Sequence, residues 1–160
     1  MRGPTLVLVA GICLWAAGGC QRSAAPYLAI GGVSPDFLLI VVGCVSLFGS
    51  RRSGTFIGFV AGVLQGALAG ANLAAYAVSR TVAGFVAGWF TSLEFEAGAI
   101  VASFVVVATT LLAQLLLMFI APPGQLAPFL LATIGSAVYN GVLAMPLYAL
   151  LRRVFDPPAR

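Results

Sequence analysis

The stretch GTFIGFVAGVLQGALAGANLAAYAVSRTVAGFVAGWF, residues 54–90, decides the fold. Glycine recurs at every fourth position over 54–70, and a helix brings residues four apart onto one slowly drifting stripe. A Gly-Ala-Asn turn at 70–72 separates this run from a second apolar run at 73–90. We therefore predict two helices, 54–70 and 73–90, joined by a tight turn.

The glycine positions predict close contact between helices. A helix without side chains along one stripe lets another helix approach its backbone, as is common in membranes. The simplest interpretation is that the two predicted helices pack against each other. The alternative is that part of the stripe receives a helix from another protein. The stripe consists of Gly54, Gly58, Gly62, Gly66 and Gly70, and the second helix continues the pattern with Gly84 and Gly88.

Arg80 is the outstanding single residue, because it lies inside the apolar run 73–90. A charge within a membrane-spanning helix is costly and usually has a partner or a role. Asp36 stands near the start of another apolar run, on the same expected side of the membrane. We expect Arg80 to reach outward and pair with Asp36, with Gln65 as a second possible partner. The alternative is that Arg80 only reaches the outer lipid headgroups.

The whole chain has the composition of a membrane protein. Of its 160 residues, 61% are hydrophobic and 8% are charged, whereas soluble domains carry about 25% charged residues. The apolar runs are continuous, which predicts helices rather than barrel strands. We predict an all-α, polytopic six-helix membrane bundle that forms one domain over 1–160. Because the second and third runs are short, five spans is the alternative. The expected helices are 4–20, 35–48, 54–70, 73–90, 97–120 and 126–151.

The arginines predict how the bundle is oriented. Positive residues collect in cytoplasmic loops, so a six-helix chain should place most of them on one side. With the N-terminus inside, only Arg22 falls in an outer loop. We therefore expect both termini to be cytoplasmic. The arginines expected inside are Arg2, Arg51, Arg52, Arg152, Arg153 and Arg160.

The N-terminal segment allows a second interpretation. Arg2, an apolar stretch and the run 17–20 resemble a lipoprotein signal peptide, in which Cys20 would be acylated after cleavage. However, Ala17 stands where leucine is usual, and lipoproteins are rarely polytopic. We expect the first helix to be retained. The remaining expectation is that the cysteines are buried free thiols; they are Cys13, Cys20 and Cys44.

The sequence offers little chemistry for catalysis. It contains no histidine, no cluster of metal ligands and no phosphate-binding glycine motif. Glu94 and Glu96 lie beside an expected helix end, where solvated loop charges are usual. We predict that the chain is not an enzyme and binds no metal or cofactor. The net charge of +4 fits membrane topology better than nucleic-acid binding.

Two polar residues, Tyr139 and Asn140, lie near the middle of the last predicted helix. A buried asparagine in lipid normally forms a hydrogen bond to a neighbouring helix. We expect Asn140 to make such a bond.

Several segments, taken in order, resemble the MreD family of bacterial rod-shape-determining membrane proteins. They are APYLAIGGVSPDFLLIVV at 25–42, the glycine-striped run at 54–70, LAAYAVSRTVAGFVAGWF at 73–90 and YNGVLAMPLYALLRRVF at 139–155. Many members place an acid near the position of Gln65, and this chain departs from them there. The resemblance covers nearly the whole chain.

The resemblance implies a non-enzymatic scaffold in the bacterial inner membrane. Such a protein binds the single-span protein MreC and helps to regulate cell shape and peptidoglycan synthesis by a RodA-type polymerase and its transpeptidase. The implied fold is similar to the substrate-binding subunits of energy-coupling-factor vitamin transporters. The glycine stripe or the Asp36 and Arg80 region would offer the MreC surface. On that view, replacing Gly58 and Gly62 with leucine should abolish co-purification with MreC.

A different function class remains open, namely a transporter subunit that binds a small vitamin. Such a subunit should present polar and aromatic residues on its outer loops. Here the expected outer loop at 20–34 offers few of them, and the other outer loops are minimal. A solute-binding subunit is therefore the second interpretation. A channel is the third interpretation. It ranks last because too few charges lie within the apolar runs to line an ion path.

Overall fold

The computed structural model describes residues 2–70, 72–91 and 98–155, apart from the side chain of Arg2. The expected turn residue Ala71, both glutamates of the 92–97 segment, Asp156 and Arg160 lie outside the described residues. The described chain folds into six helices, which confirms the all-α prediction. The helices are α1 (Arg2–Ser23), α2 (Phe37–Ser46), α3 (Arg51–Ala69), α4 (Leu73–Phe90), α5 (Ala99–Ile120) and α6 (Leu126–Phe155).

Four of the described helices, α1, α4, α5 and α6, are long and apolar enough to cross a membrane. This number is consistent with a multi-pass membrane protein. In contrast, α2 has only 10 residues. At about 1.5 Å per residue, its length is roughly half the ~30 Å thickness of the hydrocarbon core.

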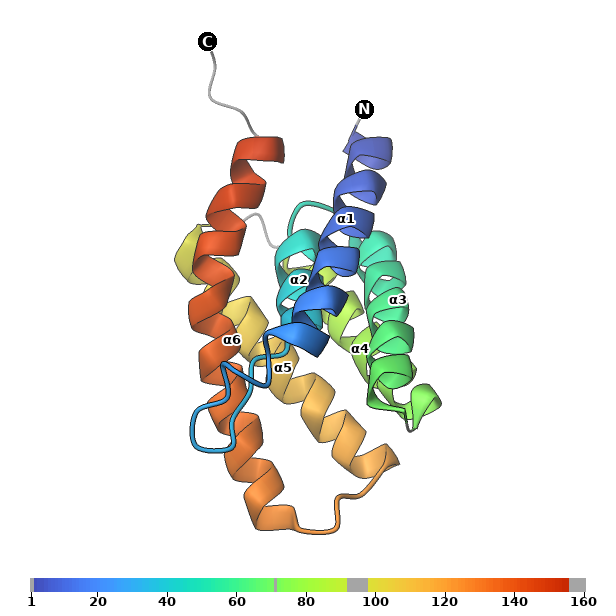
Figure 1. The fold of residues 1–160 in the computed structure, drawn as a ribbon. Helices are drawn as coiled ribbons and strands as arrows, with labels where there is room; N and C mark the ends of the chain where they lie inside the picture. The colour runs from blue at the N-terminus through green and yellow to red at the C-terminus, as the bar shows by residue number, and fades with distance from the viewer. Residues whose placement is uncertain (1, 71, 92–97, 156–160) are drawn as a thin grey trace.

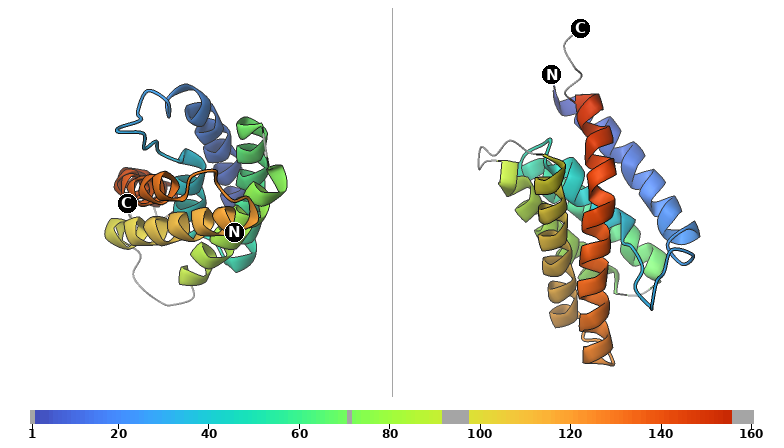
Figure 2. Two further views of the ribbon diagram at one scale, coloured as in Figure 1. Left: turned by 90° about the horizontal axis from the view of Figure 1, so that it is seen from below. Right: turned by 90° about the vertical axis from the view of Figure 1, so that its left-hand side faces the viewer.

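The short helix α2 is the centre of the bundle (Figure 1). It contacts each of the other five helices, and its residues from Leu38 to Ser46 are buried. An apolar helix that is covered all round by protein needs no polar face, which explains why its sequence shows no amphipathic pattern. The longer helices α5 and α6 run side by side as an antiparallel pair (Figure 2).

Local capping explains where the helix ends differ from the predictions. The prediction that the second helix begins at Pro35 was wrong, because Asp36 is the N-cap and the helix starts at Phe37. The third helix begins at Arg51 rather than 54, because Ser50 and Ser53 form a reciprocal capping box one turn earlier.

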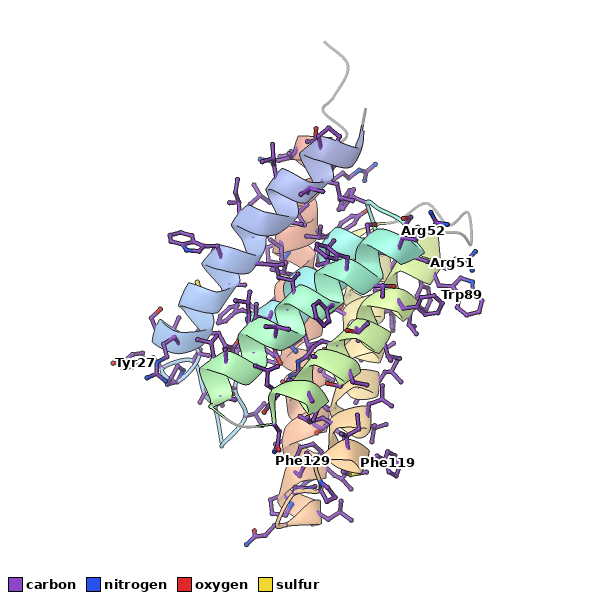
Figure 3. The ribbon with its side chains drawn as sticks, turned by 90° about the vertical axis from the view of Figure 1, so that its right-hand side faces the viewer. Tyr27, Arg51, Arg52, Trp89, Phe119 and Phe129 are labelled. Atoms are coloured by element: carbon purple, nitrogen blue, oxygen red, sulfur yellow. The ribbon has the colours of Figure 1, made fainter. Side chains whose placement is uncertain are left out.

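Apart from the buried Arg80, the arginines with described side chains lie toward one or the other end of the bundle. The first turn of α1 and the last turn of α6 lie at the same end (Figure 1). Arg51 and Arg52 lie toward that end (Figure 3), and Arg152 and Arg153 occupy the last turn of α6. Arg22 is in the last turn of α1, at the other end of that helix. These five arginines therefore follow the expected segregation.

Candidate functional site

The candidate site is built around an ion pair between Arg80 of α4 and Asp36 at the start of α2. The Arg80 Nη2 and Asp36 Oδ2 atoms are 3.0 Å apart, and the two side chains are only 1% and 7% exposed. The expected contact between these residues is confirmed. The alternative, in which Arg80 only reaches the outer lipid headgroups, was wrong, because the surrounding helices enclose the guanidinium group.

Arg80 makes two further contacts and leaves one donor unused. Its Nη1 donates a hydrogen bond to Ser79 Oγ at 3.1 Å, and its guanidinium carbon lies 4.5 Å from the centre of the Tyr76 ring. The Arg80 Nε–H has no hydrogen-bond partner among the described residues. Gln65, the second predicted partner, forms no hydrogen bond with Arg80, and its buried Oε1 atom also has no partner there.

Asp36 is fixed by its backbone as well as by its side chain. Its Oδ1 accepts a hydrogen bond from the Leu39 N–H at 3.0 Å and thereby caps α2. Its own backbone N–H donates to Asn140 Oδ1 at 2.9 Å. The positive end of the α2 dipole also favours a carboxylate at this position. The Asp36 carboxylate is therefore held where Arg80 can meet it.

Asn140 joins three helices around this carboxylate. It is fully buried in α6, and its Nδ2 donates a hydrogen bond to Thr110 Oγ1 of α5 at 3.2 Å. The predicted interhelical hydrogen bond of Asn140 is confirmed. Tyr139 acts elsewhere: its hydroxyl donates to the Leu28 carbonyl in the loop between α1 and α2 at 3.2 Å. The two neighbouring residues therefore do not share one site.

Replacing Asn140 with alanine should destabilise the folded chain by about 2–3 kcal/mol, because the buried Asp36 N–H then loses its only described partner. Unfolding by SDS titration in mixed micelles measures this loss. Tyr139→Phe is the matched control and should cost less than about 1 kcal/mol, because it removes one exposed hydrogen bond. Equal losses in the two variants would contradict the role assigned to Asn140.

The glycine stripe of α3 packs against α4, as the simpler interpretation predicted. A Cβ atom added to Gly54 would meet the backbone of Gly84, and one added to Gly58 would meet the backbone of Arg80. Gly62 and Gly66 face the α4 backbone in the same way at residues 76–77 and Leu73, and Gly88 of α4 faces residues 50–51. The close approach therefore places the Arg80 backbone directly against α3.

The alternative use of this stripe by another protein was wrong for Gly54, Gly58, Gly62 and Gly66, because α4 of the same chain covers them. Gly70 has a different role. It ends α3 in the left-handed conformation with φ of 67°, and a Cβ added there would meet nothing within 4 Å.

A polar cavity of about 160 Å³ lies beside the ion pair. It is bounded by the loop before α2 and by side chains of α1, α3, α4, α5 and α6. Most of its polar lining comes from helices rather than from the outer loop. The polar residues that line it include Gln21, Gln65, Tyr76, Arg80, Gln114 and Ser136. The sequence signal was isolated polar residues within apolar runs, but nothing showed that they would converge.

The loop between α1 and α2 covers this cavity and is tied down at several points. Gly31 and Gly32, with φ of 60° and 83°, form the tip of a tight turn. Gln21 holds the base of the loop, because its Nε2 donates to the Pro35 carbonyl at 3.3 Å and its Oε1 accepts from the Phe37 N–H at 2.8 Å. Ser136 Oγ of α6 donates to the Ser34 carbonyl at 3.1 Å.

Helix α1 is the least buried of the four candidate spans. An apolar groove of about 230 Å³ is lined by residues of α1 and α3, and another of about 390 Å³ is lined by residues of α1, α2 and α6. A Cβ atom added to Gly11 or Gly18 would meet nothing within 4 Å, and Trp15 between them is 82% exposed. Cys20 is exposed near the end of this helix, so the prediction that it is buried was wrong.

The chain matches no known family model, no curated protein and no solved structure. The resemblance to the MreD family, and the similarity to vitamin-transporter subunits that it implies, therefore stay predictions.

Proposed function

We propose that this chain is a non-enzymatic scaffold of the bacterial elongation complex in the inner membrane. It binds the single transmembrane helix of an MreC-like protein on the open face of α1. Through that protein it acts on a RodA-type polymerase and its transpeptidase. The observation that supports this function best is the face of α1 around Gly11, Trp15 and Gly18, which no other part of the described chain covers.

The open face of α1 suits a helix better than the α3 stripe does. Helices in lipid associate by close packing, and small residues allow it. Gly11 and Gly18 are seven residues apart, so they lie on one face of α1. The apolar groove that α1 lines with α3 gives a neighbouring helix room for its side chains, and its lining is almost wholly apolar. A single apolar transmembrane helix is the partner with this chemistry.

The orientation that we propose places all six helices within the membrane, with the short α2 crossing only about half of it, and both termini in the cytoplasm. Arg51 and Arg152 lie toward the end of the bundle at which α1 begins and α6 ends. Positive residues favour the cytoplasmic side. The polar cavity, at the opposite end of α2 from Arg51, would then open toward the outside.

Replacing Gly11 and Gly18 together with leucine should reduce co-purification of the organism's MreC-like protein at least tenfold. Leucine side chains there would fill the proposed contact, and a Cβ at either position meets nothing within 4 Å, so folding should be retained. The measurement is affinity purification of the tagged chain from membranes, with its thermal unfolding as a check. Ala149→Leu, on the exposed face of α6, is the control. Undiminished capture by the double variant would rule out this surface.

A second candidate function, the solute-binding transporter subunit, is favoured by the polar cavity beneath the α1–α2 loop. Its volume of about 160 Å³ argues against a vitamin, however, because pockets for molecules of drug size usually measure about 300–1,000 Å³. This function therefore ranks second.

A further inference from the structure

The apolar groove of about 390 Å³ between α1, α2 and α6 is not filled by the partner helix proposed above. That helix lies on the side of α1 that carries Gly11 and Gly18. Ala16 and Cys20 line the groove, and each is two residues from Gly18, which turns it about 160° around the helix. The groove therefore needs an occupant of its own.

Lipid hydrocarbon is the surrounding solvent for this groove. Its lining is almost wholly apolar, and α2 contributes Phe37, Ile40 and Val41 to it. If the groove stayed empty, its walls would lose the dispersion contacts that a hydrocarbon chain provides. However, lipid tails are as apolar as leucine, so an acyl chain gains little by leaving the bilayer for the groove. A preference for one lipid must therefore come from its headgroup.

The groove has the depth of one lipid leaflet. On α6 its lining runs from Leu143 to Leu150, and Arg153 follows in the last turn of the helix. The rise from Leu143 to Arg153 is about 15 Å at about 1.5 Å per residue, which is half of the ~30 Å hydrocarbon core. An acyl chain that lies along this length places its headgroup phosphate near the level of Arg153.

Arg153 is suited to bind this phosphate. Its side chain is exposed, and it has no ion-pair partner among the described residues. Residues three apart on a helix are neighbours on one side, so Arg153 stands next to Leu150 at the end of the groove. Asp156 and Arg160 follow in the sequence, and their charges cancel. The positive charge of Arg153 therefore complements an anionic headgroup.

The other exposed arginines near the groove face away from it. Arg152 is two residues beyond Leu150, and Arg22 is two residues beyond Cys20. Each is therefore turned about 160° from the groove residue before it. Arg152 and Arg153 thus share a helix end, an exposed position and a charge, and they differ in which side of α6 they occupy.

We propose that this groove binds one phospholipid with an anionic headgroup. One acyl chain lies in the groove, and the headgroup phosphate accepts charge-assisted hydrogen bonds from the Arg153 guanidinium. A zwitterionic lipid offers the same phosphate but brings an ammonium group beside two arginines. The lipid belongs to the leaflet at which α6 ends, which is the cytoplasmic one in the orientation proposed above. The groove contains neither Gly11 nor Gly18, so this site and the partner surface can fail independently.

Phosphatidylglycerol and phosphatidylcholine with identical acyl chains test the headgroup. Phosphatidylglycerol, added to the delipidated chain in detergent, should raise its thermal unfolding midpoint more than phosphatidylcholine does. Native mass spectrometry should show one retained phosphatidylglycerol. Arg153→Gln should weaken its binding at least about tenfold, the loss expected for hydrogen bonds to a charged group. Arg152→Gln is the matched control and should weaken it less than about fivefold, the general effect of one positive charge near the membrane surface.

The variant Ala16→Phe tests the groove itself, because its ring would occupy the space of the acyl chain. It should prevent retention of phosphatidylglycerol, whereas Ala149→Phe, exposed on α6 outside the groove lining, should not. Capture of the MreC-like protein should stay unchanged in both variants. Equal binding of the two lipids, equal losses in Arg153→Gln and Arg152→Gln, or undiminished retention by Ala16→Phe would each overturn the proposal.

Discussion

Asp36→Asn should destabilise the folded chain by about 3–5 kcal/mol, the usual cost of removing one member of a buried ion pair. Asparagine keeps the size of the side chain and an oxygen that can accept the Leu39 N–H, so the cap of α2 survives. What changes is the charge. Arg80 is 1% exposed and would remain charged without its only carboxylate partner among the described residues. SDS titration in mixed micelles measures the loss.

A double-mutant cycle with Arg80→Gln separates the ion pair from the other roles of Asp36. If the ion pair is the main contribution of Asp36 to stability, the double variant Asp36→Asn, Arg80→Gln should lose about 1–3 kcal/mol less free energy of unfolding than the sum of the two single losses. The hydrogen bonds from Leu39 and to Asn140 are common to all four proteins and cancel. A strictly additive cycle would show that the pair contributes nothing of its own.

The pair could be predicted from the sequence because charges are so rare in this chain. Arg80 is the only charged residue within 73–90, and a charge in lipid needs a partner. Asp36 stands at the start of the second apolar run, on the same expected side of the membrane as Arg80, which made it the expected partner. The glycine packing was predictable for a similar reason, since a spacing of four puts glycines on one face whatever the tertiary structure.

The central position of α2 could not be predicted in this way. Its sequence, FLLIVVGCVS, is apolar throughout, and such a run is equally compatible with lipid on its outside or protein on its outside. The polar cavity was missed because its lining comes from residues as distant as Gln21 and Ser136. Taken alone, each of these polar residues is also compatible with a solvated helix end. Only the packing of α3 to α6 around the loop brings them together.

Gly58→Ala should destabilise the chain by at least the ~1–3 kcal/mol typical of overpacking, although alanine normally favours a helix over glycine by about 1 kcal/mol. A Cβ at this position meets the backbone of Arg80 and that of Gly84, and a backbone cannot rotate away as a side chain can. Gly11→Ala is the matched control on α1, where a Cβ meets nothing within 4 Å. It should be neutral or stabilising by about 0.5–1 kcal/mol. The same unfolding assay compares both.

The Gly58 substitution should also weaken the ion pair, because it pushes α3 against the backbone of the residue that holds the guanidinium. Asp36→Asn should therefore cost less in the Gly58→Ala background than in the parent, by about 0.5–3 kcal/mol, the range usual for coupled neighbours. In the Gly11→Ala background it should cost the same as in the parent, because Gly11 contacts neither residue of the pair. If Asp36→Asn costs the same in all three backgrounds, then α3 packing does not position Arg80, and the stripe serves only to hold two helices together.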